Sequence, residues 1–201
     1  SIHTHLAEAY DDLVRREGAY ERMKQAAANL AGVSDRATVF SALVVLRSTS
    51  PVLAAAVDWC ADLGFTAGHL WYYSATDEQA GRTDQMPSFE AAMPSILGAL
   101  ARAPHRGSGL RSLHIPHCLL GRFADQGTDP TARTVRVATP DAVFDLADSP
   151  LTPNARIPAC VDCPRATRCR GVRRDYLAQY GDAEMAHARG QARTLLPVVP
   201  G

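Results

Sequence analysis

The stretch ATVFSALVVLRSTSPVLAAAVDWCADLGF, residues 37–65, joins a predicted strand to a predicted helix and decides the fold class. Residues 37–46 form a continuous apolar run rich in β-branched side chains, which is typical of a strand buried on both faces of a parallel sheet. Ser50 and Pro51 then begin a helix as its N-cap and first helical residue, and Gly64 ends it. The stretch therefore predicts one strand–helix unit of an α/β protein.

The same alternation continues on both sides of this stretch. Upstream, apolar side chains at helical spacing predict a helix over 6–31 with a break at Gly18. Downstream, the predicted elements are a strand at 65–74, a helix at 88–103 that begins at the N-cap Ser88, and a strand at 110–115. Because strands that alternate with helices form right-handed βα units, this order predicts a parallel sheet.

The chain changes character after the third predicted strand. Two short apolar segments flank residues 139–141, Thr-Pro-Asp, and predict a β-hairpin. An irregular connector and a helix over 172–180 follow. We therefore expect residues 1–120 to form the α/β part and residues 121–201 to form a small cysteine-bearing extension.

Composition argues against several classes of function. The 201 residues carry 21 basic and 21 acidic side chains, so there is no basic excess for binding nucleic acid. No apolar run approaches the length of a membrane-spanning helix, and we recognise no signal peptide. Five cysteines, an odd number, differ from the even and dense set of a secreted disulfide scaffold. We therefore expect a protein of the reducing cytoplasm without a membrane or nucleic-acid partner.

Three of the five cysteines lie in the stretch PACVDCPRATRCRG, residues 158–171, at Cys160, Cys163 and Cys169. A four-coordinate metal or a cubane cluster needs one more ligand. Cys118 is the candidate, because it follows a predicted strand end from which a loop can carry it to the other three. Thiolates are soft ligands that suit iron–sulfur clusters, zinc and copper(I). Spacing alone supports zinc and an iron–sulfur cluster equally.

Cys60 has a different environment from these four cysteines. It lies on the apolar stripe of the predicted helix after Pro51, with Leu53, Ala56 and Val57. Cysteine is commonly a small buried hydrophobic residue, so we expect Cys60 to be a structural core side chain.

The cysteine stretch resembles the C-terminal extension of radical S-adenosylmethionine (radical SAM) enzymes of the SPASM/twitch type. In that branch, a Cys-x2-Cys-x5-Cys-x-Gly pattern is followed by a helix with tyrosine and a Tyr-Gly-x-x-Glu ending. The segment LHIPHCLLG, residues 113–121, is similar to the late barrel strand that delivers the fourth cysteine. The resemblance implies an auxiliary [4Fe-4S] cluster held by Cys118, Cys160, Cys163 and Cys169. The other matching residues are Gly171, Tyr176, Tyr180, Gly181 and Glu184.

The first thirty residues resemble the mid-barrel segment of the same enzymes, in which a strand ends in Ser-x-His. By this resemblance, Ser1 contacts S-adenosylmethionine, and Arg47, at the end of the next strand, is a second cofactor-binding candidate. The implied fold is a partial parallel (β/α) barrel of radical SAM type followed by the cluster-binding extension.

The motif that defines the family, Cys-x3-Cys-x2-Cys, does not occur in the chain. The resemblance therefore implies that the chain is the C-terminal portion of such an enzyme and is not catalytic alone. A missing N-terminal barrel half, on the same or another chain, would hold the second [4Fe-4S] cluster and S-adenosylmethionine. The complete enzyme would use a reducing electron donor to generate a 5′-deoxyadenosyl radical. That radical would act on a small-molecule or peptide substrate.

Two other interpretations stay open. The four cysteines would hold zinc in a non-catalytic module, or they would hold a cluster in an electron-transfer or scaffold subunit that serves a partner enzyme.

Overall fold

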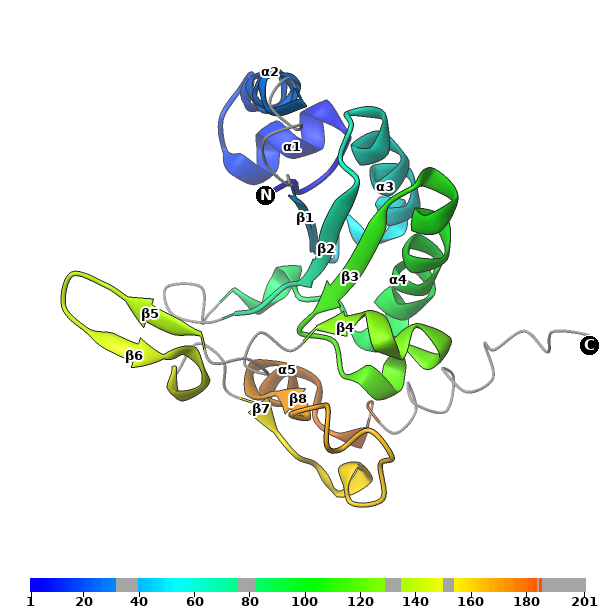
Figure 1. Ribbon diagram of the computed structural model, residues 1–201, viewed down its shortest axis with the longest axis vertical. Helices are drawn as coiled ribbons and strands as arrows, with labels where there is room; N and C mark the ends of the chain where they lie inside the picture. The colour runs from blue at the N-terminus through cyan, green and yellow to red at the C-terminus, as the bar shows by residue number, and fades with distance from the viewer. Residues whose placement is uncertain (32–39, 76–81, 129–134, 150–153, 184, 186–201) are drawn as a thin grey trace, which may run out of the picture.

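A computed structural model describes residues 1–31, 40–75, 82–128, 135–149, 154–183 and 185. At its centre is a four-stranded parallel sheet, so the predicted α/β class with a parallel sheet is confirmed (Figure 1). The strands follow chain order: β1 (Phe40–Val45), β2 (Ala67–Tyr72), β3 (Gly109–Leu113) and β4 (Gly127–Thr128). Because β4 lies beyond residue 120 and pairs with β3, the predicted extension contributes an edge strand to the sheet.

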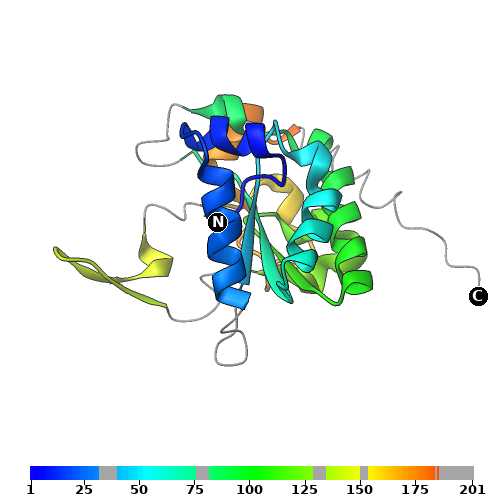
Figure 2. The ribbon, with the colours of Figure 1, turned by 90° about the horizontal axis from the view of Figure 1, so that it is seen from above.

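Two helices cover one face of the sheet. Helix α3 (Leu53–Asp62) connects β1 to β2, and α4 (Phe89–Arg102) connects β2 to β3. Figure 2 shows α3 and α4 side by side on the same face. The predicted N-terminal helix is two helices, α1 (Ala7–Val14) and α2 (Ala19–Ala31), and the predicted break at Gly18 has a positive φ of 72°.

Side chains of the central strands alternate between a buried and a less buried face. In β2, Leu70 and Tyr72 are fully buried, whereas Trp71 is 42% exposed. In β1, Ser41, Leu43 and Val45 are buried, whereas Ala42 and Val44 are only half-buried. The prediction that this strand is buried on both faces is therefore wrong, because alternate side chains along it are only half-buried.

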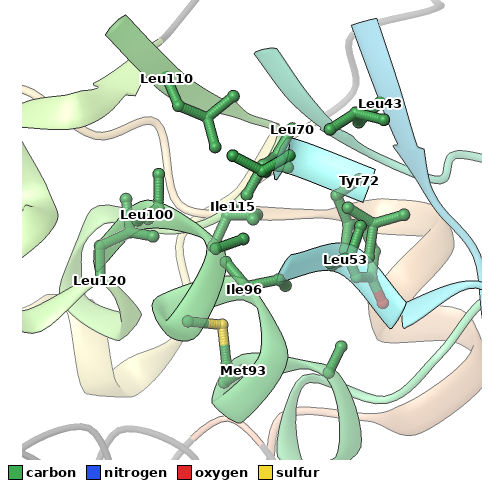
Figure 3. Packing of buried hydrophobic residues seen from close by; sticks show 14 of the residues in the cluster. Leu43, Leu53, Leu70, Tyr72, Met93, Ile96, Leu100, Leu110, Ile115 and Leu120 are labelled. Carbon is green, nitrogen blue, oxygen red and sulfur yellow. The ribbon is translucent and has the colours of Figure 1, made fainter. Parts of the chain in front are cut away.

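The hydrophobic core lies between the sheet and helices α3 and α4 (Figure 3). Leu43, Leu70 and Leu110 from the strands meet Leu53 of α3 and Ile96 of α4. Each such side chain stabilises the fold by about 1.5–3 kcal/mol through removal from water.

Cys60 belongs to the same core and is 4% exposed, as expected from its place on the apolar stripe. Burial raises the pKa of its thiol to about 11, although a hydrogen bond with Ser41 opposes that rise. Cys60 is therefore a buried neutral thiol.

The two predicted helix caps differ in outcome. The Ser88 hydroxyl accepts a hydrogen bond from the Ala91 backbone N–H at 3.1 Å, so the predicted N-cap of α4 is confirmed. Ser50 does not cap α3, because a short 3-10 turn (Ser50–Val52) precedes that helix. The Ser50 hydroxyl instead donates to the Arg47 carbonyl at 3.4 Å.

The C-terminal part contains small elements. The predicted hairpin is confirmed as β5 (Arg136–Ala138) and β6 (Val143–Asp145), and it projects from the body in both views (Figures 1 and 2). Strands β7 (Asn154–Ala155) and β8 (Val172–Arg173) form an antiparallel pair, and α5 (Arg174–Tyr180) follows. The predicted helix over 172–180 begins at 174 because its first two residues pair with β7. In the described segments, no helix is both long and apolar enough to span a bilayer.

Candidate metal centre

Four cysteines line one pocket between the end of β3 and the C-terminal elements. Cys118 lies in a 3-10 turn that follows β3, whereas Cys160, Cys163 and Cys169 lie in the loop between β7 and β8. The cavity that they enclose is small, about 20 Å³. Its other lining residues are Pro116, Arg156, Ile157, Ala159, Ala166, Gly171, Val172 and Met185. The structure thus brings together the four cysteines that the sequence singled out.

The lining has the composition of a thiolate site in an apolar environment. Arg156 is the only charged side chain among the described lining residues, which include no Asp, Glu or His. All four cysteines are half-buried, and none of them is in a disulfide with another described residue. Soft thiolate donors select iron–sulfur clusters, zinc or copper(I), and hard oxygen-preferring cations find no oxygen side chain here. Among the described residues, no three His, Cys, Asp or Glu side chains converge closely enough for a single metal ion.

Successive tight turns shape the cysteine loop. The Cys160 N–H donates to the Ile157 carbonyl at 2.8 Å, and the Cys163 N–H donates to the Cys160 carbonyl at 3.2 Å. The Arg156 guanidinium closes the loop by donating to the Ala166 carbonyl at 3.0 Å. This backbone winds around the pocket, so that side chains ten positions apart in sequence line the same space.

Gly171 is required where the loop enters β8. Its φ of +98° is in the left-handed region that favours glycine. A Cβ at this position would lie 2.8 Å from the carbonyl carbon of Ala155 and closer still to its oxygen. The close approach of β7 and β8 therefore leaves room for glycine alone.

Helix α5 docks on loops at the carboxyl ends of the strands. Tyr176 is fully buried, with its ring stacked on Phe89 at 4.1 Å, and its hydroxyl oxygen accepts from the Phe89 N–H at 3.1 Å. Asp175 accepts from the backbone N–H of Ala75 at 2.8 Å, just beyond β2. These contacts hold α5, into which the cysteine loop leads, at the carboxyl ends of the strands.

A buried charged network joins β8 to the end of β3. Arg173, 4% exposed, makes a bidentate ion pair with Asp175 through hydrogen bonds of 2.9 and 3.1 Å. The remaining terminal nitrogen of Arg173 lies 2.8 Å from Nδ1 of His114. Because a guanidinium has only donors, His114 Nδ1 accepts this bond, and the neutral ring carries its proton on Nε2. Nothing in the sequence pattern singled out this network, since the three residues have no shared periodicity.

Comparisons with models of known protein families, with curated proteins and with solved structures found nothing that matches the chain. The chemistry of the centre therefore rests on the residues and the pocket described above.

The two predicted cofactor-binding residues lie away from the cysteine pocket lining. Ser1 is exposed and precedes Ile2, which pairs with Leu43 in the middle of β1. Arg47 follows the end of β1, and its guanidinium donates to the Tyr180 hydroxyl at 2.9 Å. In the structure, Arg47 thus contributes to the docking of α5. Because Ile2 pairs with Leu43, Ser1 lies near the middle of β1, whereas Arg47 follows the end of that strand.

Proposed function

We propose that the chain is the C-terminal part of a radical SAM enzyme and binds an auxiliary [4Fe-4S] cluster through Cys118, Cys160, Cys163 and Cys169. The observation that carries this proposal is that all four cysteines line one and the same apolar pocket. The complete enzyme would modify a peptide or natural product, or mature a cofactor. Its cytoplasmic location, its electron donor and the barrel half that holds S-adenosylmethionine belong to the same proposal.

The donor set fits a cubane cluster. A [4Fe-4S] cluster takes one thiolate on each of its four irons. The four cysteines line one pocket, and among the described residues they do not converge on a single metal-ion position, which is the arrangement expected for a ligand larger than one ion. Gly171 lets the backbone of β8 pass close to β7 beside that space. Low polarity and the positive charge of Arg156 are among the features by which a protein tunes such a cluster.

The sheet supports the barrel part of the proposal. Its strands follow the chain order, and both crossover helices cover one face, as in a (β/α) barrel. A doubly wound sheet reverses its strand order and carries helices on both faces. The less buried face bears His69 and Arg111 side by side in register, with Trp71 next to them. In a closed barrel this face would line the interior, where polar and aromatic side chains bind a substrate.

The arrangement favours electron transfer or bracing over direct binding of substrate by the cluster. When bound, the cluster supplies one-electron redox chemistry, and four cysteine ligands leave no iron open for substrate. The chain's own residues would position the site: α5 through Tyr176, and the Arg173–Asp175 pair through its bond to His114.

Anaerobic purification tests the cluster. We expect a brown protein with about four iron ions and four acid-labile sulfides per chain, the content of one cubane cluster. Cys163→Ala and Cys118→Ala should each lose most of this iron, whereas the matched control Cys60→Ala should keep it, because Cys60 lies in the core. A colourless protein with one zinc would contradict the cluster and favour the zinc module. Loss of iron in Cys60→Ala alone would contradict the ligand set.

The coding sequence immediately upstream of Ser1, and that of co-encoded chains, tests the enzyme class. The proposal expects a Cys-x3-Cys-x2-Cys motif there. If iron is bound but neither place encodes this motif, the chain is an electron-transfer or scaffold subunit instead.

A further inference from the structure

The cysteine loop is rich in arginine. We call residues 156–170 the arginine loop, because this segment contains Arg156, Arg165, Arg168 and Arg170 but only one acidic residue, Asp162. The chain as a whole has no net charge, so the loop is a local concentration of positive charge. Figure 1 shows this loop at the end of the molecule opposite to α1 and α2, away from the sheet.

Within the described part of the chain, two of these arginines form long, exposed ion pairs with one carboxylate. Arg165 and Arg168 each lie 3.8 Å from the same carboxylate oxygen of Asp125. The side chains of Arg168 and Asp125 are 78% and 85% exposed. Ion pairs this exposed contribute little free energy, because water and salt screen them. Both guanidinium groups therefore stay able to exchange Asp125 for carboxylates of a partner.

An exposed apolar side chain lies beside two of the cysteines. Val161 follows Cys160 directly and is 80% exposed, the highest value among the large exposed hydrophobic residues of the described chain. A small apolar centre with a charged rim is the composition of a transient protein interface. The half-buried cysteines place their pocket immediately beneath this surface.

We propose that the arginine loop is the docking surface for a small acidic one-electron donor protein. This inference rests on the proposed function, since the electron acceptor is the cluster held by the four cysteines. In the step, the donor loses one electron and the cluster gains it, while no bond forms or breaks and no proton moves. Electron-transfer partners form small, weak interfaces that charge steers. Acidic side chains on the donor would form ion pairs with the arginines, and an apolar side chain on the donor would pack against Val161.

A nucleic acid is the other polyanion that such a loop would attract. Binding of a single strand combines basic side chains with aromatic ones on which the bases stack. The arginine loop contains no Phe, Tyr or Trp, and Asp162 lies within it. The observations therefore favour an acidic protein surface.

The test follows anaerobic reduction of the iron-loaded chain by reduced flavodoxin, an acidic one-electron donor, in a stopped-flow spectrometer. Paired substitution Arg165→Gln with Arg168→Gln should lower the second-order rate about tenfold at low salt, the lower end of the range for electrostatic steering. Salt should slow the unsubstituted chain more than this variant. The control Arg136→Gln removes an arginine about as exposed as Arg168 from the distant hairpin and should leave the rate unchanged.

Three further measurements keep the outcomes separate. Dithionite, which needs no docking surface, should reduce every variant equally, and calorimetric titration with oxidised flavodoxin should show weaker binding to the double variant. Unchanged rate and binding in a chain with full iron content would overturn the docking surface and leave the proposed function intact. A chain without iron would overturn both, and the metal analysis would show that the proposed function failed first. Displacement of flavodoxin by a single-stranded oligonucleotide would reassign the loop to nucleic acid.

Discussion

Replacing Gly171 with alanine is the sharpest structural test of the cysteine loop. The new methyl group would lie 2.8 Å from the Ala155 carbonyl carbon and 3.2 Å from the Arg156 Cα. Both neighbours are backbone atoms, so no side-chain rotation relieves the overlap. We expect β7 and β8 to separate at this point and to displace the loop that carries Cys160, Cys163 and Cys169.

The expected cost has two parts. Placing a residue with a Cβ at a φ of +98° costs about 1–3 kcal/mol. Overlap with backbone forces a shift that costs typically about 1–3 kcal/mol more. The free energy of unfolding should therefore fall by about 2–6 kcal/mol in total, a large part of the stability of a domain this size.

A matched control separates the two parts. Gly107 also has a positive φ, +67°, but a Cβ there would have no neighbour within 4 Å. Gly107→Ala should therefore cost only the backbone part, about 1–2 kcal/mol. Denaturant unfolding of the metal-free chains gives both values, and iron analysis after anaerobic loading shows whether the pocket survives. If Gly171→Ala loses no more stability than Gly107→Ala and binds iron fully, then the pairing of β7 with β8 does not shape the pocket.

Three other predictions concern the core and its surface. Tyr176→Phe removes the hydroxyl that accepts from the buried Phe89 N–H, so denaturant melts should show a loss of about 1–3 kcal/mol; an unchanged midpoint would mean that this bond contributes nothing. The folded Cys60 thiol has its pKa raised to about 11, whereas the unfolded thiol ionises near 9.0, so folding favours the protonated form. The stability of the unsubstituted chain relative to Cys60→Ala should therefore fall by about 1.4 kcal/mol per pH unit between pH 9 and 11, and parallel pH profiles would contradict this. The Asp58 carboxylate accepts from Arg102 at 2.9 Å, which holds its pKa below the usual 3.8, so Asp58→Asn should lower the thermal midpoint slightly at neutral pH. That difference should vanish as the pH falls through the lowered pKa, and a constant difference down to acid pH would refute the assignment.

The sequence predicted the parallel sheet well because its strands are apolar runs bounded by Gly, Pro and Ser. It led to a wrong prediction of how many faces of the strand at 37–46 are buried. An apolar run such as 37–46 has the same composition whether its second face meets a helix or not, so only the tertiary arrangement decides burial. The prediction of Ser50 as an N-cap is wrong for a similar reason, because the Ser50 hydroxyl donates to the Arg47 carbonyl instead of accepting from the helix.

The cysteine pocket was predictable from spacing for three residues, and Cys118 from its place after a strand. The supporting contacts were not predictable. Strands β7 and β8 have two residues each, which is too short for a strand to show an alternation of apolar and polar residues in the sequence. The hydrogen bond between Arg47 and Tyr180 joins residues far apart in sequence, and neither residue type indicates its partner.

The buried guanidinium of Arg173 connects the two parts of the chain that carry the four cysteines. Cys118 and the three loop cysteines come from segments far apart in sequence, yet Arg173 hydrogen-bonds to His114, four residues before Cys118. Arg173 also follows Val172, which lines the pocket. Both carboxylate oxygens of Asp175 accept hydrogen bonds from the Arg173 guanidinium. Removal of Asp175 would leave a buried positive charge without its partner, and the free energy of unfolding would fall by about 3–5 kcal/mol. The Arg173–His114 hydrogen bond thus ties the segment that carries Cys118 to the strand that follows the other three cysteines, which explains why all four line the same pocket.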